Sequence, residues 1–313
     1  MPGWTAEQIP DQTGRTVLVT GANSGLGYHT SMELARRGAR VMMTARDLGR
    51  GEAALAKIRA AAPGAKVELL SLDLADLSSI DTAAAEVATR TDRLDGLVNN
   101  AGVMAIPYRQ TLDGFEMQLG TNHLGHFALT GRLLPLLLAA PASRVVTVSS
   151  ALHRRVGGIN FDDPQGSRAY DKWVAYGQSK LANLLFAAEL DRRASSAGVP
   201  LMSVAAHPGY ASTNLQRVGP QMEGNRLRAA FMSVANRVVA QSDAAGALPS
   251  LYAATMPDVA GGAYYGPGGL REMRGHPTLV GRSAAAQDAA AAARLWAVSA
   301  ELTGVTYDRL AVG

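Results

Sequence analysis

The sequence contains no cysteine, and this absence excludes several kinds of site at once. Without a thiol the chain has no disulfide, no zinc–thiolate centre and no cysteine nucleophile. The six histidines also lack a pair at metal-ligand spacing on a convincing scaffold. We therefore predict no catalytic metal.

Clustered charge and long apolar runs are missing as well. Lysine and arginine number 30 against 26 acidic residues, and the basic residues are spread along the chain, which gives no footprint for nucleic acid. The most apolar later stretch, residues 133–140, is too short to cross a bilayer, and residues 1–14 lack a charged region followed by an apolar core. We predict no membrane anchor and a cytoplasmic protein.

The hydrophobic pattern alternates between short aliphatic runs and longer segments of helical period, which is typical of a parallel sheet. Strands are predicted near residues 16–20, 40–44, 66–71, 96–99, 144–149 and 201–206, and helices near 25–37, 49–61, 78–89, 113–139 and 174–197. No linker interrupts the alternation. We therefore predict an α/β fold, a doubly wound parallel sheet (Rossmann fold), in a single domain over residues 1–313.

Two stretches break the rhythm, residues 152–172 and 211–241. Loops beyond the carboxyl ends of parallel strands hold the ligands of such folds, so both are candidate substrate loops. Ordinary surface insertion is the alternative. The alanine-rich run 284–293 is predicted to begin a helix, because Leu295, Trp296 and Leu302 follow it at near-helical spacing.

A glycine-rich loop follows the first predicted strand and opens the first helix. Here glycines let the backbone turn sharply and approach a pyrophosphate, while the helix N-terminus supplies unpaired N–H groups. The loop's candidate cofactor-binding residues are Gly21, Asn23, Ser24, Gly25, Leu26 and Gly27. The alternative is a glycine turn that binds no ligand.

Tyr176 and Lys180 lie one helical turn apart, so their side chains are expected on one helix face. A phenol ordinarily has a pKa of about 10. A nearby ammonium and an oxidised nicotinamide would lower it, making Tyr176 a usable acid or base. An ordinary Tyr/Lys pair on an amphipathic helix is the alternative. His123 and His126 show no triad pattern and are interpreted as packing or surface residues.

These motifs resemble those of the short-chain dehydrogenase/reductase family, classical subgroup, over nearly the whole chain. The matching segments, in family order, are Thr20-Gly-x-x-x-Gly-x-Gly27, Asp73-Leu74, Asn99-Asn100-Ala101-Gly102, Asn122, Ser149-Ser150, Tyr176-x-x-x-Lys180, Pro208-Gly209 and Thr213. The long interval between Ser150 and Tyr176, His207 before Pro208, and the late Leu295-Trp296 resemble the retinol dehydrogenase and WW-domain oxidoreductase branch.

The resemblance implies roles for individual residues. It implies that the catalytic residues are Asn122, Ser150, Tyr176 and Lys180, with Asn122 holding a water that relays protons through Lys180. It prefers Ser150 over Ser149 for orienting the substrate oxygen. Further cofactor contacts are implied for Asp73, Leu74, Asn100, Ala101, Gly102, Tyr176, Lys180, Pro208, Gly209 and Thr213. Taken alone, Asp73 is equally a turn former at a strand end, and Asn122 a residue that bonds an adjacent turn.

The end of the second strand indicates which dinucleotide is preferred. An NAD enzyme usually has a carboxylate there for the ribose 2′-hydroxyl, whereas this chain has Ala45 followed by Arg46, whose guanidinium can pair with a 2′-phosphate. NADP(H) is therefore preferred over NAD(H), with Arg46 as a cofactor-binding residue. Asp47 would favour NAD if the strand ended later.

The predicted function is hydride transfer between the nicotinamide and a carbonyl or alcohol of an apolar small molecule. Trp173, Met222, Phe231 and Met232 either line its pocket or belong to the core or a subunit contact. The alternatives are a catalytically silent dinucleotide sensor or scaffold, and an epimerase or dehydratase that uses the same Tyr/Lys pair. Family resemblance also implies a homodimer or homotetramer formed through the helices near 113–139 and 174–197.

Overall fold

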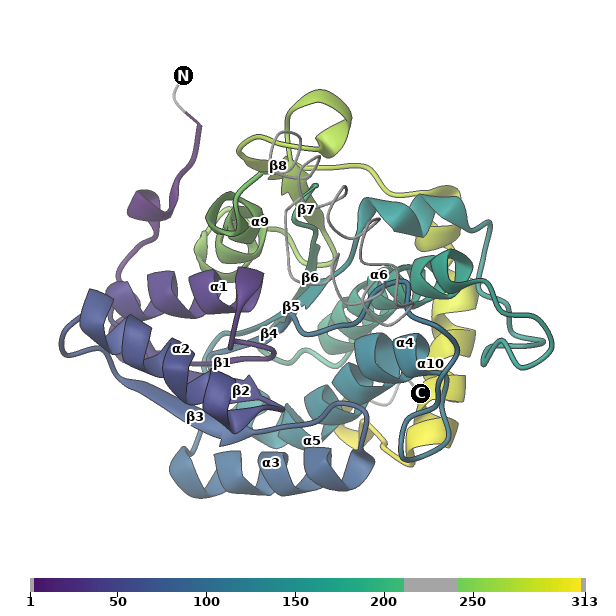
Figure 1. Ribbon diagram of the computed structural model, residues 1–313, viewed down its shortest axis with the longest axis horizontal. Helices are drawn as coiled ribbons and strands as arrows, with labels where there is room; N and C mark the ends of the chain where they lie inside the picture. The colour runs from purple at the N-terminus through teal and green to yellow at the C-terminus, as the bar shows by residue number, and fades with distance from the viewer. Residues whose placement is uncertain (1–2, 211–240, 311–313) are drawn as a thin grey trace, which may run out of the picture.

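The central feature of the molecule is an eight-stranded sheet with the order β3-β2-β1-β4-β5-β6-β7-β8 (Figure 1). The computed structural model describes residues 3–210 and 241–310. All neighbouring strands are parallel except β7 and β8, which pair antiparallel. The strands are β1 Thr16–Val19, β2 Arg40–Ala45, β3 Val67–Ser71, β4 Gly96–Asn99, β5 Ser143–Val148, β6 Leu201–Ala206, β7 Tyr264–Pro267 and β8 Pro277–Leu279.

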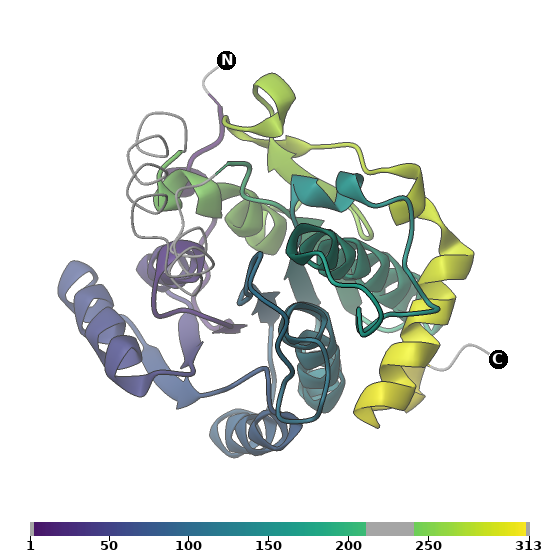
Figure 2. The same cartoon turned by 45° about the vertical axis from the view of Figure 1, so that its right-hand side comes forward.

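Helices connect successive parallel strands and cover both faces of the sheet (Figures 1 and 2). The α-helices are α1 Gly25–Arg36, α2 Leu48–Ala61, α3 Leu77–Arg90, α4 Met117–Leu119, α5 Gly125–Ala139, α6 Lys172–Ser196, α9 Asp243–Thr255 and α10 Ala289–Thr303. The π-helical turn η2, Gly120–Leu124, joins α4 to α5, and the 3-10 turn η3, Ala151–Arg155, follows β5. The predicted doubly wound parallel sheet is confirmed.

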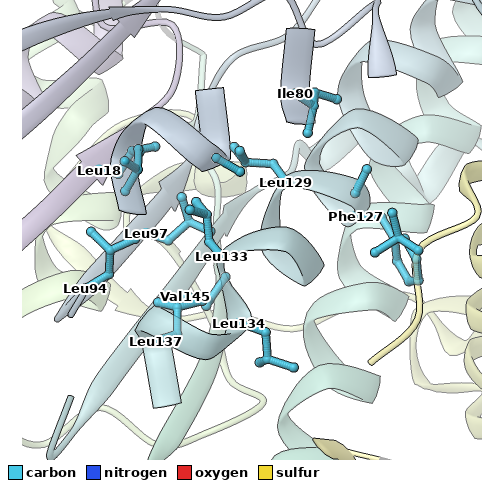
Figure 3. Packing of buried hydrophobic residues seen from close by; sticks show 14 of the residues in the cluster. Leu18, Ile80, Leu94, Leu97, Phe127, Leu129, Leu133, Leu134, Leu137 and Val145 are labelled. Carbon is cyan, nitrogen blue, oxygen red and sulfur yellow. The ribbon is translucent and has the colours of Figure 1, made fainter. Parts of the chain in front are cut away.

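Alternating apolar residues on the strands explain the two covered faces. In β1, Val17 and Val19 join a buried cluster with residues of α1, α2 and α9, whereas Leu18 joins the cluster that includes residues of α3 and α5. Successive side chains of a strand point to opposite faces, so an unbroken aliphatic strand can be buried on both. Figure 3 shows Leu18, Leu97 and Val145 of the sheet packed against Leu133 of α5.

The C-terminal helix α10 packs over α6 (Figure 2). The Trp296 ring stacks on Phe186 at 5.9 Å and lies 4.5 Å from the Tyr307 ring, and the Arg193 guanidinium lies 4.6 Å from the centre of Trp296. Every α6 residue from Tyr176 to Leu190 is buried or half-buried. The middle of α6 is thus packed within the chain, and the predicted subunit pairing through this helix stays a prediction.

Several element boundaries differ from those predicted. The helix predicted from residue 113 begins at Met117, because residues 111–114 form a turn and the Glu116 carboxylate caps the helix by accepting from Gln118 N and Leu119 N. In the run 284–293, Ala284–Gln287 form a 3-10 turn and residues 289–293 begin α10 after its N-cap Asp288, so the predicted helix starts five residues later. Helix α9 and strands β7 and β8 were not predicted.

Candidate active site

The glycine-rich loop forms a tight turn at the carboxyl end of β1. Gly21 and Gly25 have φ angles of 64° and 59°, a region that disfavours residues with a Cβ atom. At Gly27 a Cβ would lie 2.5 Å from the Gly21 carbonyl oxygen and 2.5 Å from Asn100 Nδ2. The glycines therefore keep the loop, the start of α1 and the end of β4 in close contact.

The N-terminus of α1 keeps the properties expected of an anion site. Ser24 is the N-cap, and within the described part of the chain its side chain makes no capping hydrogen bond. The first-turn N–H groups and the helix dipole therefore remain available to a pyrophosphate. Asn23, Ser24 and Gly25 are half-buried here, whereas Leu26 is buried in the wall behind them. This cradle fits a dinucleotide.

The segment that follows β4 is fastened to the end of β1. The Thr20 hydroxyl oxygen accepts hydrogen bonds from the backbone N–H groups of Asn100 and Ala101, both at 2.9 Å, and Asn100 Nδ2 donates to the Thr20 carbonyl at 2.7 Å. The predicted residues Asn100, Ala101 and Gly102 thus line the edge of the sheet beside the glycine loop. Thr20, the first residue of the glycine-rich fingerprint, was not among the predicted cofactor contacts, yet its hydroxyl holds two of these backbone amides.

The predicted catalytic side chains Ser150, Tyr176 and Lys180 meet at the same edge of the sheet. Tyr176 is 7% exposed and Lys180 is 4% exposed, and Lys180 Nζ lies 5.7 Å from the centre of the Tyr176 ring. Lys180 Nζ also donates to the Val148 carbonyl at 3.1 Å, which ties α6 to the end of β5. Helical spacing has therefore placed the phenol and the ammonium on one face, as predicted.

Burial shifts the pKa values of this pair. It raises the pKa of Tyr176 to about 12, and a hydrogen bond with the Ser150 side chain acts in the opposite direction. Burial lowers the pKa of Lys180 to about 8. Without the coenzyme, loss of water around the phenol outweighs the effect of its neighbours. The predicted lowering of the Tyr176 pKa, which includes the charge of an oxidised nicotinamide, stays a prediction.

The two adjacent serines have different partners. Ser149 is buried, and its hydroxyl donates to the Lys180 carbonyl at 2.7 Å, so it holds α6 against β5. Ser150 is half-buried, its side chain acts on the pKa of Tyr176, and its Oγ accepts from Leu152 N at 3.2 Å. Ser150 is accordingly the serine beside the phenol.

Asn122 lies in the π-helical turn η2, a rare element that is frequent at functional sites. Its Oδ1 accepts from Val103 N at 2.8 Å, and its Nδ2 donates to the Val103 carbonyl and to Ser179 Oγ, both at 2.9 Å. A Cβ at Gly102 would lie 2.8 Å from Asn122 Oδ1 and 3.7 Å from Lys180 Nζ. The Asn122 amide therefore holds the segment after β4 and α6 together beside Lys180.

The end of β2 presents a cation. Strand β2 ends at Ala45, and the Arg46 side chain that follows is 72% exposed, with Nη1 4.0 Å from Asp73 Oδ2. The Asp47 carboxylate caps α2 by accepting from Arg50 N at 3.0 Å, and Asp73 Oδ1 accepts from Ala75 N at 3.0 Å in a turn after β3. Both carboxylates are thus engaged in backbone turns, while buried Leu74 packs beneath the turn that carries Asp73.

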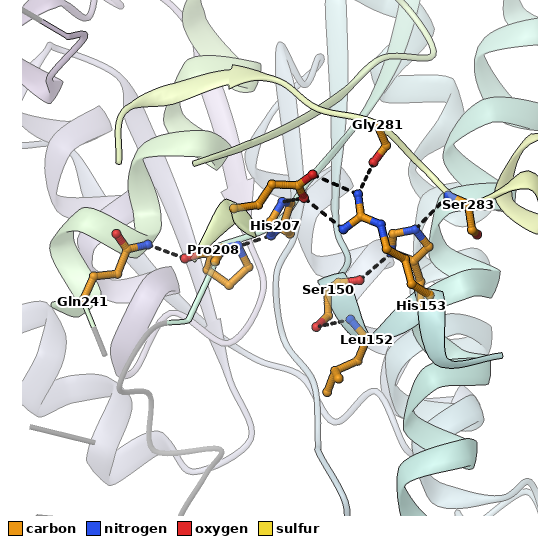
Figure 4. Close-up of polar contacts among 11 residues, drawn as sticks. Ser150, Leu152, His153, His207, Pro208, Gln241, Gly281 and Ser283 are labelled. Carbon is orange, nitrogen blue, oxygen red and sulfur yellow. Dashed lines mark hydrogen bonds and ion pairs between the residues drawn. The ribbon is translucent and has the colours of Figure 1, made fainter. Parts of the chain in front are cut away.

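A polar cluster that the sequence analysis missed joins the end of β6 to the loop between β7 and β8 (Figure 4). His207 Nε2 lies 3.1 Å from Glu272 Oε2, and the Arg154 guanidinium donates to both oxygens of Glu272 at 2.9 and 3.0 Å. The contact with His207 holds the pKa of Glu272 at about 2, with Arg154 contributing. His207 Nδ1 in turn accepts from Gly209 N at 3.2 Å, so this cluster orients the predicted Pro208–Gly209 turn.

The two predicted substrate loops are not equally described. Residues 156–171 contact the segment that leads into α4: the Tyr170 hydroxyl donates to the Ile106 carbonyl at 3.0 Å, and Glu116 N, at the N-cap of α4, donates to Gln165 Oε1 at 2.7 Å. Trp173 is half-buried, and its ring lies 5.9 Å from the Arg155 guanidinium. Thr213, Met222, Phe231 and Met232 lie outside the described residues, as does nearly all of the loop predicted at 211–241.

Histidines 123 and 126 are both buried, at 1% exposure each, so the surface alternative is wrong. Within residues 3–210 and 241–310, no group of three or more His, Cys, Asp or Glu side chains could hold a metal ion. In the same described ranges, none of the helices is long and apolar enough to cross a membrane.

Proteins of known family are similar to this chain over most of its length. A family model described as short chain dehydrogenase matches residues 15–224. Retinol dehydrogenase 13 of Homo sapiens is 42% identical over 295 residues, covering 93% of this chain and 85% of that protein. Retinol dehydrogenase 14 of Mus musculus is 41% identical over 304 residues, covering 93% and 86%.

A crystal structure of an uncharacterized protein from Mycobacterium paratuberculosis is similar over 98% of this chain and 99% of that one, with 46% identity and a TM-score of 0.79. These similarities confirm the resemblance to the family and to its retinol dehydrogenase branch. The chain belongs to the short-chain dehydrogenase family and is an oxidoreductase that acts on CH–OH or C=O groups.

Proposed function

We propose that this protein is an NADP(H)-dependent, single-domain oxidoreductase of the cytoplasm that interconverts bulky apolar carbonyls and alcohols, with Tyr176 as the proton-transfer residue. The observation that carries the proposal is the meeting of Ser150, Tyr176 and Lys180 beside the glycine cradle of β1 and α1. The names of the similar proteins point to retinol, an apolar alcohol, and support the substrate class.

The chemistry divides between the coenzyme and the side chains. When bound, the nicotinamide supplies or takes up the hydride. The Tyr176 hydroxyl donates a proton to the carbonyl oxygen during reduction, and a phenol with a pKa of about 12 is protonated and ready to donate. The Ser150 hydroxyl bonds the same oxygen and orients it, while Lys180 Nζ would hold the nicotinamide ribose.

Turnover of NADPH with a panel of hydrophobic aldehydes, ketones and quinones tests this function. We expect absorbance loss from NADPH with bulky apolar members of the panel and little with small polar ones. Tight NADPH binding without turnover of any compound would favour the sensor or scaffold alternative. Conversion of a sugar nucleotide without net coenzyme turnover would favour the epimerase or dehydratase.

The rate should also depend on pH through Lys180. Its pKa of about 8 means that the side chain is an ammonium below pH 8 and a neutral amine above it. Because the ammonium form is the one that holds the ribose and stabilises the phenolate left when Tyr176 donates its proton, kcat/KM for NADPH should be level below about pH 8 and fall above it. In Lys180→Arg the alkaline fall should vanish even though the rate is lower. An unchanged alkaline limb in that variant would assign the pKa to another group.

The cofactor preference is proposed from the end of β2. Arg46 is exposed there, and the two nearby carboxylates are engaged in turns. Removing the guanidinium in Arg46→Ala should raise KM for NADPH about tenfold and leave KM for NADH within about twofold, because only the 2′-phosphate needs it. Arg50→Ala, which removes an exposed arginine in the first turn of α2, is the matched control and should change neither value. A wild-type protein that prefers NADH would contradict the assignment.

A further inference from the structure

His126 is the second residue of α5, directly after the π-helical turn, and the mechanism above gives it no role. Its two ring nitrogens bond to groups far apart in the sequence. Nδ1 lies 3.0 Å from the Asn122 carbonyl oxygen, and Nε2 lies 2.9 Å from Thr20 Oγ1. One buried imidazole thus spans from the turn that carries Asn122 to the end of β1.

The chemistry of these partners fixes the position of the ring proton. A carbonyl oxygen only accepts, so Nδ1 carries the hydrogen and donates to Asn122. Burial lowers the pKa of His126 to about 4, and the ring is therefore neutral near pH 7. Nε2 must then accept, which makes the Thr20 hydroxyl the donor. The competing acceptor for that hydroxyl, the Val98 carbonyl, is farther away at 3.4 Å.

Thr20 extends this series of hydrogen bonds to the segment after β4, which borders the proposed cofactor site. With its hydrogen given to His126, the oxygen is left to accept from the backbone N–H groups of Asn100 and Ala101, at 2.9 Å each. Each hydrogen bond thus has one defined direction, from the amides after β4 through Thr20 and His126 to the Asn122 carbonyl. Satisfied buried networks of this kind hold one geometry.

The hydrogen-bond network around His126 matters for the candidate active site because Asn122, Gly102 and Lys180 are closely packed. A Cβ at Gly102 would already be 2.8 Å from Asn122 Oδ1 and 3.7 Å from Lys180 Nζ. A shift of the π-helical turn against the segment after β4 would therefore displace Asn122 or Lys180. Misplacement of about 1 Å can cost about a hundredfold in rate.

We propose that His126 is a positioning residue for the reaction, which holds the Asn122 turn at a fixed distance from the Asn100–Gly102 segment through Thr20. The role rests on the proposed function, since it acts through the groups placed around Tyr176 and Lys180. It requires the neutral ring with hydrogen on Nδ1.

The test compares His126→Phe, Thr20→Val and the double variant with the wild type, using NADPH and the best carbonyl found in the panel. We expect each single variant to lower kcat about tenfold or more with KM for the carbonyl nearly unchanged. The kcat of the double variant should be no lower than that of the poorer single variant, because both substitutions break the same series of hydrogen bonds. His123→Phe is the matched control: its ring is equally buried but its Nε2 bonds Ser299 Oγ at 2.8 Å, so kcat should persist even if the melting temperature falls.

A second measurement does not depend on turnover. Nitrogen-15 NMR of the histidine rings, with His126 identified from the missing signal of His126→Phe, should show a protonated Nδ1 and a bare Nε2. Thr20→Val should move the Nε2 signal. A wild-type ring protonated on Nε2, or variants that lose stability but keep kcat, would overturn the proposal. Failure of the wild type to reduce any carbonyl would instead count against the proposed function, and the NMR arm would still decide the hydrogen-bond chain.

Discussion

Tyr176→Phe should lower kcat by about a hundredfold to ten-thousandfold, the usual contribution of a positioned general acid. The substitution removes one hydroxyl from a ring that is 7% exposed, so the packing of α6 around it should be preserved. The Ser150 side chain acts on the pKa of this hydroxyl, and Lys180 Nζ lies 5.7 Å from the centre of the ring. The loss should therefore appear in kcat, measured by NADPH oxidation, while the dissociation constant for NADPH stays close to that of the wild type.

Tyr252→Phe is the control for this substitution. Tyr252 lies on α9, and its hydroxyl donates to Asp258 away from the candidate active site. It loses a phenolic hydroxyl as Tyr176→Phe does, and its kcat should match the wild type. Equal turnover by Tyr176→Phe and the wild type would remove Tyr176 from the mechanism.

Gly27→Ala should abolish tight NADPH binding, a loss we expect to be at least about thirtyfold in the dissociation constant. The new Cβ would lie 2.5 Å from the Gly21 carbonyl oxygen, a backbone atom, and 2.5 Å from Asn100 Nδ2, which is held by Thr20. Alanine favours a helix over glycine by about 1 kcal/mol, but overpacking against fixed atoms costs about 1–3 kcal/mol. The clash therefore outweighs the propensity, and the loop must open. Titration of NADPH by fluorescence measures the result.

The matched control is Gly49→Ala, also near the start of a helix. A Cβ there would meet its nearest atom, Asp47 Oδ1, at 3.5 Å, which is an ordinary contact. This substitution should leave NADPH binding unchanged and stabilise the fold by about 0.5–1 kcal/mol in urea unfolding. Wild-type affinity in Gly27→Ala would show that the loop does not approach the pyrophosphate.

The sequence predicted strands β1 to β6 well because each is a short, mainly aliphatic run between turn residues. Local signals indicated the glycine loop and placed Tyr176 and Lys180 on one helix face, whereas Ser150 was implied by the family resemblance. The later strands β7 and β8 were missed because Tyr264–Pro267 ends in glycine and proline, and Pro277–Leu279 begins with proline. Such residues predict a turn, and only pairing with the edge of the sheet makes these segments strands.

Residues that act through long-range contacts were not predicted. Glu272 contacts His207 and Arg154 across three segments, and no local pattern indicates that they meet. His126 was interpreted as a packing or surface residue because no carboxylate or serine pattern around it indicates a triad. Its role depends on Thr20, whose hydroxyl reaches it only once β1 and α5 are packed together.

The dependence of α6 on α10 has a consequence for the order in which the protein folds. Translation produces all seven parallel strands and α6 before Trp296 and Tyr307, the residues that complete the aromatic cluster around Phe186. A nascent chain can therefore form the sheet while the apolar side of α6 is still exposed to solvent, where it can aggregate or bind chaperones. Premature termination upstream of Trp296 should give a sheet-containing product that is insoluble rather than merely less active.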